Sequence, residues 1–254
     1  MEPIFDSHAH YDDEQFDPDR DALLNRIHKQ GVSAIVNASS TMESCDTCVR
    51  LAQQYPFVYA AVGIHPNEAA TLPEDWLDRL RALARRDRVV AIGEIGLDYY
   101  YKDPPAEVQK RVLRAQLALA KELDLPVIIH SRDAIMDTYE ELKGRGLEGV
   151  IHCFSGSAEM AKLFLDEGFY LGFGGVVTFK NAKRVKAALA VTPLDRLLFE
   201  TDCPYLAPEP FRGKRNDSSL IRYTAAAAEE ILHTDRNVLL RTAADNAARL
   251  FRIG

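Results

Sequence analysis

Residues 127–134, VIIHSRDA, contain the pattern from which the architecture of this chain can be inferred. A short, continuously apolar run, residues 127–129, is followed directly by the polar side chain of His130. A run that is apolar without alternation is typical of a strand covered on both faces, as in parallel sheets. The stretch before it, residues 106–123, keeps apolar residues at helical spacing. These features predict one strand of a helix-flanked parallel sheet.

The same pattern recurs along the whole chain. Apolar runs occur at residues 4–6, 34–37, 58–62, 89–92, 127–129, 149–151, 170–173 and 197–199. Stretches with helical character lie between them, at residues 20–30, 44–54, 76–86, 106–123 and 158–167. Strands that alternate with helices indicate βαβ units, and 254 residues match the length of one (β/α)8 barrel. We predict an α/β TIM barrel in one domain, residues 1–254; a doubly wound open sheet is the alternative, because periodicity does not exclude it.

Composition limits the classes of function. The chain has a net charge of -7, whereas general polyanion binders carry a basic excess, so any nucleic-acid contact must be local. The N-terminus has neither a basic segment nor a long apolar stretch, which predicts no signal peptide and no membrane span. We expect a cytoplasmic monomer that does not contact a membrane.

Cys45 and Cys48 have the CxxC spacing found in redox motifs and in zinc sites. They fall in the stretch at 44–54 that is expected to be helical, and no second CxxC follows to complete a four-sulfur site. We therefore favour a structural role for both cysteines.

Histidines and carboxylates gather at the ends of the expected strands. In a barrel all these ends open on one face, where active sites lie, so the side chains should converge. A strand would also direct His8 and His10 to the same side, because they are separated by one residue. Imidazoles together with carboxylates suit zinc, manganese, iron or nickel. For a single histidine a polar loop position is the simpler explanation, but the set predicts a metal site made of His8, His10, Glu94, His130, His152 and Asp202, with His65 nearby.

Seven motifs in one order resemble the TatD family of metal-dependent deoxyribonucleases. They are FDSHAHYDD (5–13), GIHPNEA (63–69), GEIGLDYYY (93–101), VIIHSRDA (127–134), IHCFSG (151–156), ETDCPYLAP (200–208) and RGKRND (212–217). The match extends from Phe5 to Phe251, and the family is similar to amidohydrolase-type barrels.

The resemblance implies a site for two divalent metal ions, Mg, Mn or Zn. One ion would be held by His8, His10 and Asp202, the other by His130 and His152, and Glu94 would bridge them. His65 would contact a substrate phosphate or the attacking water without binding metal. The chain departs from the family at Asn67 and Phe211, where a histidine is often found.

A phosphodiester is attacked slowly, because it is an anion, and two cations can stabilise both the attacking and the departing oxygen. We predict a DNase with 3′-5′ exonuclease action in which a metal-bridging water attacks phosphorus. Asp202 would orient that water and accept its proton, so that Asp202, Glu94 and His65 form the catalytic group. For Glu200 we favour a structural role at the end of the last strand.

A basic loop and a tyrosine run are candidates for contacting the substrate. Guanidinium groups match the geometry of phosphate, and the family match favours phosphate contact by Arg212, Lys214 and Arg215 over a merely solvated loop. Tyr99, the first of three consecutive tyrosines, is a candidate for base stacking. Packing of the loop is the alternative for the tyrosines.

Three other functions remain open at this stage. Related barrels hydrolyse amides and lactones, but many of them place a carbamylated lysine where this chain has Glu94. Cleavage of an ester at the 3′ end of RNA, as by a D-aminoacyl-tRNA deacylase, is not distinguished from DNase action. A barrel that binds without catalysis is disfavoured because the full ligand set is present.

Overall fold

The computed structural model describes residues 2–254, and its eight parallel strands form one sheet in the order β1 to β8. A doubly wound sheet would reverse the strand order at a switch point, and this order is sequential throughout. The predicted (β/α)8 barrel is therefore confirmed. The strands are β1 (Ile4–Ala9), β2 (Val32–Ala38), β3 (Val58–Val62), β4 (Val89–Asp98), β5 (Val127–Arg132), β6 (Gly149–Ile151), β7 (Tyr170–Phe173) and β8 (Leu197–Phe199).

The barrel is nearly closed between β1 and the segment after β8. Ala9 and Cys203 form an isolated parallel bridge, and the His10 amide donates to the Cys203 carbonyl at 2.8 Å. The Asp202 amide donates to the carbonyl of His8 at 3.0 Å. This seam places Asp202 next to His8 and His10, although almost 200 residues separate them in the chain.

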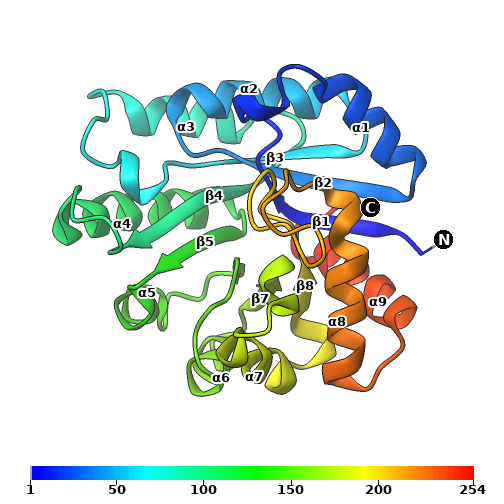
Figure 1. Cartoon of the computed structure of the whole chain (residues 1–254). Coiled ribbons are helices and arrows are strands. Elements are labelled where there is room, and N and C mark those ends of the chain that lie inside the picture. Colours follow the sequence, from blue (N-terminus) through cyan, green and yellow to red (C-terminus); the bar gives the residue numbers. More distant parts are fainter. Residues whose placement is uncertain (1) are drawn as a thin grey trace.

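Helices surround the strands (Figure 1). The α2 helix begins with a capping box, in which Thr41 and Ser44 satisfy each other's backbone N–H groups. The α4 helix has the bounds expected from the sequence. The helices are α1 (Arg20–Lys29), α2 (Met42–Gln54), α3 (Trp76–Ala84), α4 (Ala106–Leu123), α5 (Ile135–Leu142), α6 (Ala158–Asp166), α7 (Lys183–Val191), α8 (Ile221–Leu232) and α9 (Arg236–Leu250).

Two of the hydrophobic clusters contain residues of the barrel strands. The larger cluster contains residues of the strands and of the helices packed on them. The smaller cluster takes at least one residue from each of the eight strands, which identifies it as the barrel interior, and adds residues from the end of α9. Phe5 of β1 stacks on Phe251 with ring centroids 6.2 Å apart. The interior is thus a packed core, as in other barrels, and it supports the site above it.

Three strands continue beyond the apolar runs that predict them. β1 includes His8, β4 includes Glu94 and β5 includes His130, so these side chains lie within strands and not after them as expected. The β4–β5 ladder pairs Gly96 with His130. Gly96 has a φ of +155°, and a Cβ there would clash with the His130 carbonyl oxygen. This position therefore requires glycine for the close approach of the two strands.

The α2 helix contains both cysteines of the CxxC pair, buried and free. The Cys48 sulfur accepts a hydrogen bond from the Asn37 side chain at 3.0 Å, and Cys45 Sγ lies 3.1 Å from Ser39 Oγ. Across residues 2–254, no helix combines the length and hydropathy that crossing a membrane requires.

Candidate metal centre

The six side chains predicted to bind metal meet at the carboxyl end of the barrel. His8 is fully buried, and Glu94 and His152 are 3% and 5% exposed. His130 and Asp202 are more open to the pocket above, with side chains 17% and 19% exposed. All of the set except the buried His8 line a pocket of about 730 Å³, a volume within the usual range of ligand sites.

One group of donor atoms forms around His8 and His10. Their Nε2 atoms lie 3.0 Å apart. Glu94 Oε2 is 3.3 Å from the first and 3.5 Å from the second. Asp202 Oδ1 lies 3.5 Å from His8 Nε2 and 3.3 Å from His10 Nε2. Four nitrogen and oxygen atoms thus surround one point.

The other oxygen of Glu94 faces a second pair of histidines. Glu94 Oε1 lies 2.7 Å from His130 Nδ1 and 2.8 Å from His152 Nε2, and these two nitrogens are 3.3 Å apart. The His8 and His152 rings stack with centroids 3.9 Å apart, so the two groups are adjacent. The Glu94 carboxylate is shared between them.

The donor set fits divalent metal ions. Ligands about 2.1 Å from a tetrahedral ion lie about 3.4 Å from one another, which is close to the separations of 3.0 to 3.5 Å around His8 and His10. The separations around His130 and His152 are shorter, at 2.7 to 3.3 Å. His10 Nδ1 donates to the Ala38 carbonyl at 2.9 Å, and His130 Nε2 donates to Asp98 Oδ2 at 3.1 Å. Such outer contacts turn the other ring nitrogen of a histidine toward a metal. Groups of three within this set meet the spacing that one ion requires.

In the absence of a metal ion, the negative charge of this set is balanced by protons on its histidines. Burial raises the pKa of Glu94, but the charges of His152 and His8 outweigh it and hold that pKa well below its usual range. Burial lowers the pKa of His10, but a hydrogen bond to Asp202 and the charge of Glu94 raise it to about 10. The carboxylates are thus ionised, and His10 carries a proton that a metal ion would displace.

His65 stands beside this set in neutral form. Burial lowers the pKa of His65 to about 4. Its Nδ1 accepts the backbone N–H of Asn67 at 3.2 Å, so Nε2 carries the hydrogen, and Nε2 lies 3.8 Å from Glu94 Oε1. Within residues 2–254 the buried Asn67 Oδ1 has no hydrogen-bond partner. Both residues line the pocket.

Part of the backbone strain of the protein lies at the pocket. Cys153, Asp202 and Leu206 all line it, and all have positive φ, at +44°, +58° and +52°. A left-handed conformation costs a residue with a Cβ about 1–2 kcal/mol, and such costs gather at functional sites. The strain at Asp202 places its carboxylate opposite His8 and His10.

Of the residues predicted to bind substrate, His65 lines the pocket, whereas Arg212, Lys214, Arg215 and Tyr99 are not among its lining residues. Arg215 forms a bidentate ion pair with Asp19, at 2.8 and 2.6 Å. Arg212 lies over the Phe179 ring at 4.4 Å, and Lys214 is exposed. The Tyr99 hydroxyl donates to Asp137 at 2.8 Å. Their contact with substrate stays a prediction.

Phe211 and Glu200, whose roles the sequence left open, both pack against other side chains. The ring of Phe211 packs edge-on against Tyr223, with centroids 5.0 Å apart. Glu200 is 1% exposed, and its Oε1 lies 3.6 Å from His152 Nδ1. Its side chain occupies the space that a Cβ at Gly172 would need, so the small residue on β7 makes room for it.

Asp98 and Arg132 are among the pocket residues that were not singled out from the sequence. Asp98 is 1% exposed and accepts from His130, and Arg132 ends β5. Side chains alternate along a strand, so Asp98 shares a face with Glu94, and Arg132 shares one with His130. This alternation could have predicted Asp98 and Arg132 as pocket residues. It could be applied only if both strands were known to continue beyond their apolar runs.

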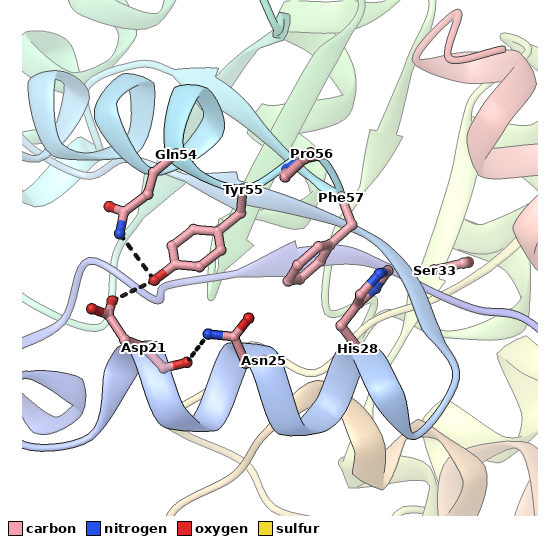
Figure 2. Close-up of a pocket in the computed structure, with 8 residues that line it drawn as sticks. All are labelled: Asp21, Asn25, His28, Ser33, Gln54, Tyr55, Pro56 and Phe57. Carbon is pink, nitrogen blue, oxygen red and sulfur yellow. Dashed lines mark hydrogen bonds between the residues drawn. The ribbon is translucent and has the colours of Figure 1, made fainter.

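A second hollow, of about 570 Å³, lies between α1 and the segment that joins α2 to β3 (Figure 2). Its polar groups are already engaged: the Tyr55 hydroxyl donates to Asp21, and Asn25 donates to the Asp21 carbonyl at 2.8 Å. His28 stacks on Phe57 with centroids 4.1 Å apart. None of the possible metal-ligand groups found in residues 2–254 lies there. The pocket above Glu94 is therefore the better candidate for catalysis.

Comparisons with known proteins agree with this choice. A family model described as TatD related DNase matches residues 5–252. The chain is 44% identical over 253 residues to YabD of Bacillus subtilis (strain 168), named an uncharacterized metal-dependent hydrolase, and the match covers 98% of this chain and 99% of YabD. It is 36% identical over 262 residues to the protein of Cronobacter sakazakii named 3′-5′ ssDNA/RNA exonuclease TatD, covering 98% of this chain and 97% of that protein.

A solved structure shows the same fold. The crystal structure of YjjV, described as a TatD homolog from Escherichia coli K12, superposes with a TM-score of 0.93 at 35% sequence identity. The superposition covers 99% of this chain and 98% of YjjV. The whole barrel is thus shared with that protein.

Proposed function

Because this chain belongs to the TatD-related DNase family of metal-dependent hydrolases, we propose that it removes nucleotides from the 3′ end of single-stranded DNA by hydrolysing phosphodiester bonds. The observation that carries the proposal is the shared carboxylate of Glu94, with one oxygen toward His8 and His10 and the other toward His130 and His152. The Cronobacter sakazakii relative named an exonuclease supports the choice of substrate.

The proposed ligands divide into two groups. His8, His10 and Asp202 would hold one divalent ion, His130 and His152 the other, and Glu94 would bridge them. When bound, such a pair of ions supplies positive charge to the attacking and departing oxygens of a phosphodiester. The chain itself then has to orient the phosphate and move protons.

Two side chains are suited to those tasks. Asp202 Oδ1 faces the histidines, and the partly exposed side chain reaches the pocket, so Asp202 is placed to accept a proton from the attacking water. His65 is neutral and carries its hydrogen on Nε2, so it can donate to a phosphate oxygen.

The first test is digestion of single-stranded DNA labelled at its 5′ end, with manganese, magnesium or zinc. A 3′-5′ exonuclease should shorten the labelled strand one nucleotide at a time. Asp202→Asn should lower the rate by about a hundredfold, because a general base contributes at least that factor. Glu68→Gln is the matched control, since Glu68 lines the same pocket but belongs to neither ligand group. Digestion unchanged in Asp202→Asn would mean that a contaminant acts.

Metal affinity should rise with pH. In the metal-free protein His10 has a pKa of about 10, so at neutral pH a metal ion must displace its proton, and affinity should rise about tenfold per pH unit for each proton displaced. Titration calorimetry with manganese, in two buffers of different ionisation enthalpy, counts the protons released. His28→Asn, outside the pocket, should release the same number. Binding without proton release would contradict the proposed role of His10.

The alternatives are distinguished by substrate. A panel of single-stranded DNA, RNA, aminoacylated tRNA and small amides, measured with the same metal ions, separates phosphodiester, ester and amide hydrolysis. Preference for aminoacylated tRNA or for an amide would replace the proposed function while leaving the metal site in place.

A further inference from the structure

Arg132 is the single arginine or lysine among the described residues that line the pocket above Glu94. The same pocket is lined by four carboxylates, Glu68, Glu94, Asp98 and Asp202. A strand of nucleic acid carries one negative charge per phosphate, and an acidic pocket repels it. Any phosphate that does not lie directly over the metal ligands therefore needs a cation from the chain, and Arg132 is the cation at this position.

The guanidinium of Arg132 is oriented by contacts with two tyrosine rings, and these contacts leave its N–H groups available. Its Cζ lies 3.7 Å from the centroid of the Tyr100 ring and 5.8 Å from that of Tyr101. Within residues 2–254 it has no ion pair and no side-chain hydrogen bond, in contrast to Arg215, which pairs with Asp19. Stacking engages the face of a guanidinium and leaves its N–H groups free at the edge. Arg132 can therefore present a fork of donors to a phosphate.

The position of Arg132 on β5 sets its distance from the reacting bond. His130 and Arg132 are two residues apart on one face of the strand, which corresponds to about 6.6 Å along the strand. His130 is largely buried at the bottom of the pocket, whereas Arg132 is exposed at its mouth. Successive phosphates of a nucleic-acid strand have a comparable separation. With one phosphate at the metal ligands, the next can reach Arg132.

We propose that Arg132 binds the phosphate one nucleotide inward from the bond that is cut, so that the site selects a strand over an isolated phosphodiester. Tyr101 and Tyr205, each 51% exposed, line the same pocket and provide aromatic surfaces for the bases beside that phosphate. This inference rests on the proposed 3′-5′ exonuclease function and assigns the contact that gives it an oligonucleotide substrate.

The test combines a protein variant with a substrate variant. The substrate is single-stranded DNA whose penultimate 3′ linkage is either a phosphate or an uncharged methylphosphonate. We expect the methylphosphonate to lower kcat/KM of the wild-type protein about 10- to 100-fold, the usual value of a hydrogen bond to a charged group. Arg132→Ala should lose a similar factor on natural DNA and nothing more on the methylphosphonate strand. Arg132→Lys should recover part of the loss, because it keeps the charge.

Two controls separate this contact from a general defect. Bis(p-nitrophenyl) phosphate has a single phosphate, so its hydrolysis by Arg132→Ala should fall much less than the digestion of DNA does. Arg212→Ala and Lys214→Ala remove exposed cations that do not line the pocket, and each should keep full sensitivity to the methylphosphonate.

The outcomes distinguish failure of the Arg132 contact from failure of the proposed exonuclease function. If wild-type protein shortens DNA but Arg132→Ala keeps the wild-type sensitivity to the methylphosphonate, the inference is wrong and the exonuclease proposal stands. If sensitivity is lost in Arg212→Ala or Lys214→Ala instead, the basic loop binds that phosphate. If wild-type protein cleaves bis(p-nitrophenyl) phosphate but not DNA, the exonuclease proposal fails, and the Arg132 contact fails with it.

Discussion

Replacing Glu94 with glutamine is expected to lower metal-dependent hydrolysis by at least about a thousandfold, the equivalent of about 4 kcal/mol in the barrier. The Glu94 side chain has almost the same shape as glutamine, but its two oxygens face four histidine nitrogens at 2.7 to 3.5 Å. An amide has one acceptor oxygen, and its NH2 group cannot bind a cation. One of the two donor groups must therefore lose its shared ligand.

Metal content and activity should be measured on the same samples. After reconstitution with manganese or zinc, elemental analysis should give about two ions per wild-type chain and fewer in Glu94→Gln. Glu94→Asp keeps the carboxylate but shortens the side chain, and should retain more metal than the amide. Thermal unfolding and the Glu68→Gln control show whether the fold is intact. A wild-type content below one ion per chain would exclude a binuclear site.

The second large effect concerns stability. Gly96→Ala should lower the free energy of unfolding by about 4 kcal/mol, near the upper end for single substitutions. The reason is geometric, because a Cβ at Gly96 would clash with the carbonyl of His130 on the neighbouring strand. A φ of +155° adds strain to any residue other than glycine. Urea unfolding followed by circular dichroism measures the change.

A second glycine, Gly146, serves as a control that separates the steric clash of an added Cβ from the cost of a positive φ. Gly146 also has positive φ, at +63°, but a Cβ there would meet open space. Gly146→Ala should therefore cost only about 1–2 kcal/mol, the price of a left-handed residue. Equal losses in both variants would show that β4 can move away from β5 without penalty. A larger loss in Gly96→Ala should also weaken metal binding, because Asp98 and His130 sit on these two strands.

The hydrophobic pattern was sufficient for the order of the strands and for five of the helices, whereas α5, α7, α8 and α9 were not predicted from it. Each of the eight apolar runs is a strand, and residues 106–123 form α4 with the expected bounds. Strands covered on both faces must be apolar throughout, and the helices must keep one apolar face. The seven motifs were equally sufficient for the family, which the match over residues 5–252 confirms.

Where each strand ends depends on the hydrogen bonds that its backbone forms with the neighbouring strand, and hydropathy gives no information about these bonds. The run at 89–92 ends before Glu94, but β4 continues to Asp98 because its backbone still pairs with β5. Polar side chains can point into the pocket while the peptide groups remain in the ladder. Glu94 was therefore predicted from the sequence, whereas Asp98 and Arg132, which lie farther beyond the apolar runs, were not.

By itself, the sequence determined the barrel, the family and which six side chains gather at the carboxyl ends of its strands, because these depend on hydropathy and on order along the chain. The tertiary structure alone decided which atoms face one another: Oε1 and Oε2 of Glu94 toward different histidines, and Asp98 behind His130. It also decided that Arg215 pairs with Asp19, 196 residues away, while Arg132 forms no ion pair within residues 2–254. Such contacts depend on how distant segments pack, and no local pattern records them.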